Sequence, residues 1–571
     1  MNKARHLARH LLKRLLFLIL CLLGVTLLAC GPFLTGGLWH GSDLGYHLRR
    51  IENIAMGLAA GQFPVRIQSD WVNGCGYAVG VFYGDVLLYA PALLRLAGVP
   101  VSAAYDAYLF GITLCTAAAG YYAGRRLGGG RCACAAGAVL YTLSAYRLCD
   151  VTDRAALGEY TALAFLPLVA AGFWRTLRPD RARLPGWALL VLGLSGVLQS
   201  HLLSFEMTVL LLALAALLCA RQVFSRAAFG RLAGAAGVFC ALNAGFLLPL
   251  LDYYLTGKFA INQPGGVEPI QANGAALGQL LGLPYTLASG QQAELVQGMA
   301  LTPGPALLLG ALAAAGGAAY ALARRRDRRA AACLALAAAG AGCLALSGNF
   351  FPWDALYALG GAAQRLVGSL QFPWRFLGPA CLFLALAVGA GLQLANPRLR
   401  AGAAAALCLV AAVAAAGQLR AYTATAAPES YTYGTEEPFW QMGCGHYLPA
   451  ENGPTDLNAL PAGPVWADGI TLTAYEKAGT TITFTASNDS EVEAWVRLPL
   501  LWYRGYTARG ADGSAPAVTC GENNLVTVTL APGQSGSFTV RFTEPWPWRA
   551  AEALTALTAL ALAVWLARRR Q

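Results

Sequence analysis

The feature that most constrains this chain is a series of apolar runs, each about 17 to 24 residues long and so able to cross a bilayer as a helix. Of the 571 residues, 57% are hydrophobic and only 12% are charged, whereas soluble domains carry roughly 25% charged residues. The sequence therefore predicts a polytopic α-helical membrane protein with about 12 transmembrane helices. The predicted helices lie near residues 15–33, 101–124, 132–148, 158–174, 186–200, 203–220, 232–250, 301–323, 330–347, 376–395, 401–418 and 549–567.

Basic residues gather in the short segments between alternate apolar runs. These segments hold 25 of the 41 Lys and Arg residues but only two of the 29 acidic residues. The asymmetry follows the positive-inside rule, so we expect both termini in the cytoplasm. It also accounts for the net charge of +12 without a nucleic-acid partner. The long loops near 34–100, 251–300, 348–375 and 419–548 then lie on the outer face, where we expect the function to lie.

The last outer loop differs in pattern from the rest of the chain. Short stretches rich in Thr and Val alternate polar and apolar residues between Gly, Pro, Asn and Asp, which predicts a small antiparallel β-sandwich. Cys444 and Cys520 both belong to this segment, and a disulfide between them is one alternative. The stretches are Ile470–Ala474, Thr480–Ala486, Glu491–Leu498, Leu525–Leu530 and Ser537–Phe542.

These patterns divide the chain into three predicted domains. The positive-inside alternation requires that Tyr77–Ala97 does not cross fully, so we expect a re-entrant or surface element there. The domains are a transmembrane domain at 1–418 with outer loops 34–100, 251–300 and 348–375, a mainly-β extracytoplasmic domain at 419–548, and a C-terminal transmembrane helix with a basic tail at 549–571.

The polar stretch Gly41–Ile67 contains the densest group of reactive side chains. On a helix with 100° per residue, Asp43, His47 and Arg50 fall within roughly 60° of one another beside an apolar stripe. Asp43 is either a helix N-cap or a general base, since a positioned carboxylate accepts the proton of a sugar hydroxyl. His47 either contacts substrate or lies at the interface with its tip in water. Arg50 binds either a phosphate or lipid headgroups.

Further charged side chains are predicted at the same outer rim. Glu159 lies at a helix entrance, as a functional carboxylate or as a cap, and Arg154 lies in the short loop before it. His201 occupies a tight turn between two apolar runs, as a ligand or as a plain turn residue. Arg365 and Arg375 lie in the outer loop that ends at a helix start, where they would meet an anionic lipid carrier or anchor the chain at the interface.

Recognisable catalytic fingerprints are missing from the sequence. It contains no phosphate-binding Gly-rich loop, no nucleophile elbow and no metal-binding helix motif. Acidic clusters are few, so no cofactor is assigned and a divalent metal remains open. Motifs alone therefore name no reaction.

A resemblance to known protein families indicates a more specific function. The run SDLGYHLRRIENIAMGLAAGQFPVRI, followed by NGCGYAVGVFYGDVLLYAPALL, resembles bacterial membrane proteins described as 6-pyruvoyl-tetrahydropterin synthase-related, although nothing here resembles pterin chemistry. Over most of its length the chain is also similar to YfhO-like membrane proteins, through ALGEYTALAFLPL, QFPWRFL and LPLLWYRGYTARGADG. Both groups resemble the GT-C glycosyltransferases, which take sugars from polyprenyl-phosphate carriers at the outer membrane face.

The resemblance implies a GT-C-like glycosyltransferase in the bacterial cytoplasmic membrane, with its active side outside. It implies a polyprenyl-phosphate sugar as donor and an envelope glycan or lipid as acceptor, both met at the lipid bilayer. It also implies an essential acidic residue in the first outer loop, which is Asp43. Here Asp43 has no acidic neighbour, so the pattern does not support a paired-carboxylate or metal-assisted mechanism.

A non-catalytic alternative remains open at this stage. The chain would then be a lipid or glycan transporter, or an envelope scaffold whose outer domain binds polymer. A transporter is expected to have broken helices and polar groups near the bilayer midplane. The polar groups of this sequence lie mainly at the outer rim, which favours the enzyme.

Overall fold

The computed structural model describes residues 2–35, 38–262, 269–283, 298–327, 329–426, 428–429 and 445–569. The chain divides into two compact units, each built from separated stretches of sequence. The first unit comprises residues 1–44, 102–239 and 267–431, and the second comprises residues 45–101, 240–266 and 432–571. The two units are described separately below.

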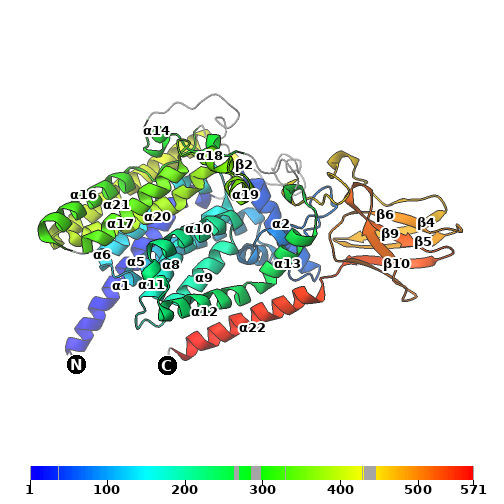
Figure 1. Cartoon of the computed structure of the whole chain (residues 1–571), viewed down its shortest axis with the longest axis horizontal. Coiled ribbons are helices and arrows are strands. Elements are labelled where there is room, and N and C mark those ends of the chain that lie inside the picture. Colours follow the sequence, from blue (N-terminus) through cyan, green and yellow to red (C-terminus); the bar gives the residue numbers. More distant parts are fainter. Residues whose placement is uncertain are drawn as a thin grey trace. The chain divides into compact units, whose positions relative to one another are not determined.

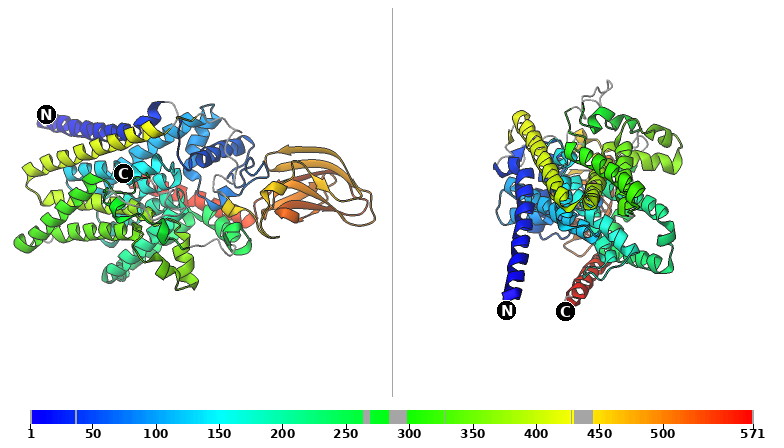
Figure 2. Two further views of the ribbon diagram at one scale, coloured as in Figure 1. Left: turned by 90° about the horizontal axis from the view of Figure 1, so that it is seen from above. Right: turned by 90° about the vertical axis from the view of Figure 1, so that its left-hand side faces the viewer.

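The first unit is mainly helical, with one short antiparallel pair of strands, β1 (Leu38–Trp39) and β2 (Pro428–Glu429) (Figure 1). Small residues allow its helices to pack closely, since a Cβ on Gly172 would lie 2.4 Å from the backbone nitrogen of Leu190, and one on Gly193 would lie 2.8 Å from that of Val169. Figure 2 shows the long helices running roughly side by side. The helices are α1 (Asn2–Ala29), α5 (Val101–Arg126), α6 (Arg131–Thr142), α7 (Ala145–Val151), α8 (Leu157–Leu177), α9 (Gly186–Leu198), α10 (Leu202–Leu218), α11 (Ala220–Val223), α12 (Arg226–Leu242), α14 (Leu277–Leu280), α16 (Pro305–Arg325), α17 (Arg329–Ser347), α18 (Trp353–Tyr357), α19 (Gly361–Ser369), α20 (Leu377–Leu394) and α21 (Pro397–Thr425).

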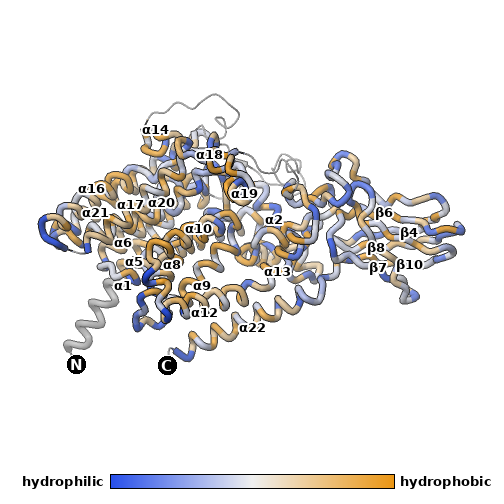
Figure 3. The backbone as a smooth tube through the Cα atoms, in the orientation of Figure 1, coloured by the Kyte–Doolittle hydropathy of each residue, from blue (hydrophilic) through white to orange (hydrophobic). Residues whose placement is uncertain are grey.

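Within the described residues, seven helices are long and apolar enough to cross a membrane, and the number rises to nine if each of two bent pairs forms one span. The chain is thus a multi-pass membrane protein, as predicted, although the count of 12 is not confirmed. Two predicted spans, α9 and α10, have only 13 and 17 residues. In Figure 3 the long helices are mainly hydrophobic, and hydrophilic residues gather at their ends.

The helix break between α6 and α7 is stabilised by hydrogen bonds from a neighbouring segment of the chain. The two helices bend by 44°, and the backbone N–H groups exposed at the break are satisfied from elsewhere. Those of Ala145 and Tyr146 donate to the carbonyls of Pro303 and Thr302, at 3.3 and 2.9 Å. Because these bonds replace the intrahelical ones, the break is stable and fixes the direction of α7.

The second unit combines short helices, a β-sandwich and the last long helix. The helices are α2 (Leu44–Ala59), α3 (Val79–Phe82), α4 (Tyr89–Leu96), α13 (Ala244–Thr256) and α22 (Trp546–Arg568). Neither α3 nor α4 is long enough to cross a bilayer, in keeping with the expectation for Tyr77–Ala97. The loop between α2 and α3 turns tightly, since Val72, Asn73 and Gly74 all have positive φ and Lys477 Nζ donates to the Gly74 carbonyl at 2.6 Å.

The structure confirms that the predicted segment forms an antiparallel β-sandwich. Two four-stranded antiparallel sheets have the orders β4-β5-β10-β7 and β3-β6-β9-β8. On β5 the buried residues Ile482, Phe484 and Ala486 alternate with more exposed ones, which is the period of two that the sequence shows. The strands are β3 (Val465–Trp466), β4 (Ile470–Ala478), β5 (Thr481–Asn488), β6 (Ala494–Leu501), β7 (Tyr506–Gly510), β8 (Ala517–Cys520), β9 (Leu525–Leu530) and β10 (Ser535–Phe542).

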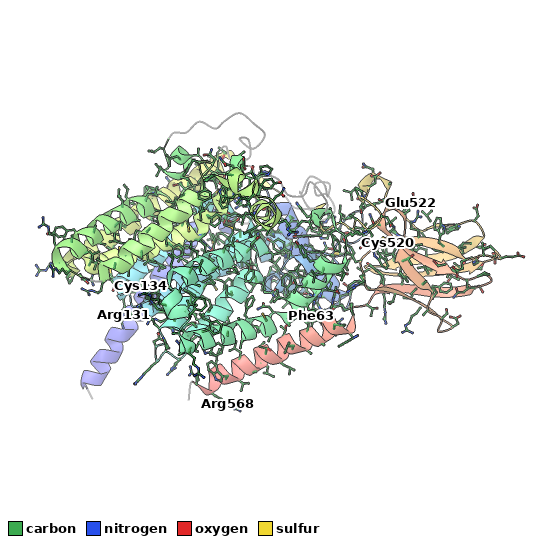
Figure 4. The ribbon with its side chains drawn as sticks, viewed as in Figure 1. Phe63, Arg131, Cys134, Cys520, Glu522 and Arg568 are labelled. Atoms are coloured by element: carbon green, nitrogen blue, oxygen red, sulfur yellow. The ribbon has the colours of Figure 1, made fainter. Side chains whose placement is uncertain are left out.

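Cys520 lies at the end of β8, and Figure 4 labels it together with Glu522. Its sulfur lies 3.7 Å from the side-chain amide nitrogen of Asn452. Cys444, the other half of the disulfide considered from sequence, lies outside the described residues, as do parts of the outer loops at 284–297 and 430–444. The disulfide therefore stays a prediction.

Candidate functional site

A buried cluster of charged side chains lies in the first unit, around the turn between α7 and α8. Tyr146 and Asp150 are four residues apart and so lie on one face of α7. The chain then reverses in the turn 152–156 and enters α8, whose first turn carries Glu159. Arg154 lies within the reversal, next to Ala155, whose φ of +47° is uncommon for a residue other than glycine. This tight turn brings an acidic helix end and an acidic helix start to the same guanidinium.

Glu159 is the centre of the cluster. Its Oε2 accepts from Arg154 Nη1 at 2.9 Å and from Arg375 Nε at 3.2 Å. Its Oε1 accepts from the hydroxyl of Tyr146. Arg154 Nη1 also donates to Asp150 Oδ1 at 2.5 Å. Glu159 is 2% exposed and the two arginines are 5% and 8% exposed, so one buried carboxylate holds two guanidiniums side by side.

Arg375 reaches Glu159 from a distant part of the chain. It lies in a short 3-10 turn at Pro373–Phe376 that leads into α20. Gln371 adopts a φ of +59°, and its side-chain Oε1 accepts from Arg375 Nη1 at 3.0 Å. The guanidinium also lies 4.9 Å from the ring centre of Phe372. A strained backbone residue therefore orients Arg375 toward the cluster, as occurs at functional sites.

Asp43 is fastened to the same turn by backbone bonds. The N–H groups of Ser42 and Asp43 donate to the carbonyls of Asp153 and Arg154, at 3.2 and 2.8 Å. Gly41 makes this approach possible, because a Cβ there would lie 2.5 Å from the Cβ of Ala155. Partial burial raises the pKa of the Asp43 carboxyl, the nearby Arg154 and Arg375 lower it, and the net direction is upward. A carboxylate with a raised pKa is suited to accept a proton.

The structure brings together five of the eight residues predicted from sequence: Asp43, Arg154, Glu159, His201 and Arg375. His201 begins α10 as its N-cap, and its Nδ1 accepts from the Ser204 N–H at 3.2 Å. It also lies close enough to Glu159 for electrostatic interaction. Both readings of His201, as a turn residue and as part of a site, therefore have a structural basis.

The other three predicted residues are His47, Arg50 and Arg365. α2 begins at Leu44, so Asp43 precedes the helix, and the predicted helical face shared with His47 and Arg50 is wrong. His47 and Arg50 belong to the second unit, where Arg50 is 1% exposed, donates to the Gly84 carbonyl at 2.9 Å and lies 4.1 Å from the ring centre of Tyr83.

Arg365 is exposed on α19. Within the described ranges, no hydrogen bond or ion pair joins it to the cluster. Its predicted role in binding an anionic lipid carrier gains no support from these contacts.

Sequence reasoning missed Tyr146, Asp150 and Gln371. Asp150 had a detectable signal, since a carboxylate at the end of an apolar run is costly in a membrane and marks a functional position by default. Gln371 had no such signal, because the local sequence does not predict a left-handed backbone conformation at a glutamine.

An apolar cavity of about 230 Å³ adjoins the break between α6 and α7. Its wall includes Ala145, which directly precedes Tyr146 of the cluster. Much of the rest comes from α16 and α21, with Thr302 and Gln418 among the few polar side chains. The cavity has the size and character to hold part of a hydrocarbon chain. Among the described residues, no group of three or more His, Cys, Asp or Glu side chains is placed to hold a metal ion.

No family model matches the sequence, and no curated protein matches it. Three solved structures show a distant likeness. They are the arabinofuranosyltransferase AftD from Mycobacteria (TM-score 0.41, 16% identity, 71% of this chain and 27% of that chain), the oligosaccharyltransferase from Archaeoglobus fulgidus in its apo form (0.39, 13%, 72% and 56%), and ArnT from Cupriavidus metallidurans bound to undecaprenyl phosphate (0.29, 13%, 65% and 77%).

The chain therefore spans about a quarter of the first of these proteins and just over half of the second. Similarities this low assign neither a family nor an activity. The resemblance to the 6-pyruvoyl-tetrahydropterin synthase-related, YfhO-like and GT-C groups stays a prediction.

Proposed function

We propose that this protein is a membrane glycosyltransferase that moves a sugar from a polyprenyl-phosphate carrier to a cell-envelope glycan or lipid. The observation that carries the proposal is the position of Asp43 within electrostatic reach of two buried guanidiniums that Glu159 holds together. A sugar transfer from a lipid phosphate needs a base and a site for the leaving phosphate, and this arrangement offers both. The outward orientation of the cluster is part of the proposal.

The arginines keep donors available for the phosphate. Arg154 uses Nη1 for its bonds to Asp150, Glu159 and Tyr146, and its Nε and Nη2 have no partner within the described part of the chain. Arg375 uses Nε and Nη1, which leaves Nη2. Guanidinium groups recognise phosphate through paired N–H donors, so the free edges fit this ligand. The adjoining apolar cavity would take part of the carrier's hydrocarbon chain.

The proposed reaction is a single displacement. The Asp43 carboxylate accepts the proton of the acceptor hydroxyl, whose oxygen forms a bond to the anomeric carbon of the sugar. The bond between that carbon and the phosphate oxygen breaks, and the polyprenyl phosphate leaves with the electron pair. Arg154 and Arg375 stabilise the charge that develops on the phosphate.

A second candidate, a lipid or glycan transporter, has one observation in its favour. The helix pair α6–α7 is bent by 44°, and broken helices are common in transporters. A transporter would bind the carrier without cleaving the sugar–phosphate bond.

The test is turnover by purified protein in lipid nanodiscs, supplied with a panel of radiolabelled polyprenyl-phosphate sugars and an envelope-glycan extract. Because water can replace an unknown acceptor slowly, release of free polyprenyl phosphate is measured together with glycan labelling. We expect release with at least one donor. Binding of donors without release from any of them would contradict the enzyme and support the transporter.

A further inference from the structure

One buried carboxyl oxygen of the charge cluster has no hydrogen-bond partner among the described residues. Asp150 is fully buried, at 0% exposure, and its Oδ1 accepts from Arg154 Nη1. Its Oδ2 is also buried and has no partner among the described residues. Because both oxygens belong to one carboxyl group, the unpaired oxygen lies within the cluster. Buried polar atoms without partners are rare in proteins, and a missing ligand is one explanation for them.

The position of this oxygen is well fixed. α7 carries Asp150 and is held at its start by the bond from the Tyr146 N–H to the Thr302 carbonyl. One residue further on, the buried Arg147 donates from Nη2 to Thr116 Oγ1 at 2.9 Å, and its guanidinium lies 3.8 Å from the ring centre of Tyr160. These contacts tie α7 to α5 and α8. The free oxygen is thus preorganised.

The charges of the cluster indicate what this oxygen accepts. Three carboxyl groups, those of Asp43, Asp150 and Glu159, lie within electrostatic reach of the guanidiniums of Arg154 and Arg375. A phosphate group brings further negative charge and has no reason to approach an unpaired carboxyl oxygen. A hydroxyl or an ammonium group fits it, because each donates a hydrogen bond.

Building on the proposed function, we propose that Asp150 recognises the transferred sugar by accepting a hydrogen bond from one of its hydroxyl or ammonium groups. In this arrangement Arg154 connects sugar recognition with phosphate binding, because it contacts the Asp150 carboxyl and would also hold the phosphate. A site built to hydrogen-bond one polar group discriminates strongly against ligands that lack it, because its own buried group is then left unpaired. Asp150 therefore separates the glycosylated carrier from the bare one.

The experiment is equilibrium binding to the full-length protein in nanodiscs, which does not depend on turnover. Three probes are compared: undecaprenyl phosphate, undecaprenyl phosphate-linked glucose and undecaprenyl phosphate-linked 4-amino-4-deoxyarabinose. The wild type is expected to bind at least one glycosylated lipid about ten times more tightly than the bare carrier, the effect of one well-formed hydrogen bond. Asp150→Leu removes both oxygens and leaves no donor or acceptor for a sugar hydroxyl or ammonium, while Arg154 Nη1 keeps its bonds to Glu159 and Tyr146.

Asp150→Leu is expected to lose this tenfold preference for the glycosylated lipid over the bare carrier. Loss for both sugars indicates a hydroxyl, and loss for the amino sugar alone indicates an ammonium. Asp180→Asn is the matched control. Asp180 lies on the loop after α8, where its carboxylate pairs with Arg126, so this variant should keep the preference. If the Leu variant does not fold, Asp150→Glu, which displaces the oxygen by one methylene, is expected to weaken the preference in the same direction.

An unchanged preference in Asp150→Leu would overturn the inference and leave Oδ2 with a structural water. A wild type that binds the bare and glycosylated carriers equally would also overturn it, while the proposed glycosyltransferase would survive if turnover is found. A wild type that binds none of the three lipids would contradict the proposed function itself, and the inference would fall with it.

Discussion

Replacing Glu159 tests most directly whether the buried charged side chains of the cluster stabilise the fold together. Its Oε2 neutralises two guanidiniums at 2.9 and 3.2 Å, and all three side chains are at least nine-tenths buried. Removing one partner of a buried ion pair typically costs about 3–5 kcal/mol, because the remaining charge is left in a medium of low polarity. Glu159→Gln keeps one acceptor oxygen, so we expect a loss near the lower limit, about 3 kcal/mol.

The assay is thermal unfolding of the purified protein in nanodiscs, where a loss of this size corresponds to a fall of about 2–3 °C for a chain of 571 residues. Asp327→Asn is the matched control, since it breaks an ion pair with Arg329, whose side chain is 78% exposed, and should leave the midpoint unchanged. The double variant Glu159→Gln/Arg375→Gln is expected to be less destabilised than the sum of the single variants. A midpoint for Glu159→Gln within about 1 °C of the wild type would refute the reasoning.

Three further predictions follow from close contacts, burial and the cavity. Gly41→Ala places a Cβ 2.5 Å from that of Ala155, so it should destabilise the protein by about 1–3 kcal/mol and reduce turnover, whereas Gly31→Ala, which meets open space, should do neither. Burial raises the pKa of Asp85 to about 6, so its stabilising effect is complete below about pH 4 and is lost as the pH rises through 6. Asp85→Asn should therefore be more stable than the wild type at pH 8, by up to about 3 kcal/mol, and equal to it near pH 4 in denaturant titrations. Ala415→Phe fills the cavity and should weaken binding of undecaprenyl phosphate at least tenfold while leaving the binding of a short-chain analogue unchanged; equal loss for both would argue against a chain-binding role.

Local patterns in the sequence predicted the elements of this fold well. The alternation over Thr480–Ala486 corresponds to β5, and the apolar runs at 186–200 and 203–220 correspond to α9 and α10. These agreements arise because periods of 2 and 3.6 residues follow directly from strand and helix geometry. The number of membrane crossings was predicted less well, since an apolar helix of 13 residues such as α9 does not by itself span a bilayer.

The candidate site was predictable only in part. Glu159 and Arg154 are neighbours in sequence, and a costly carboxylate at a helix entrance marked them. Arg375 meets Glu159 across 216 residues, and no local pattern encodes that pairing. Asp43 was selected for a helical face that it does not occupy; its place in the cluster results from backbone bonds to the turn at 153–154, which depend on tertiary packing.

The measurement that tests the central claim most directly is single-turnover transfer by the wild type and Asp43→Asn, with donor binding measured on the same samples. The account predicts that the variant binds the polyprenyl-phosphate sugar as tightly as the wild type but cleaves it at least 100 times more slowly, since general base catalysis contributes about 10²–10⁴-fold. Asn at this position keeps the backbone bonds that hold residue 43, so the comparison isolates the carboxylate. Equal cleavage rates in the two proteins would contradict the account, and so would a wild type that binds the donor and never cleaves it.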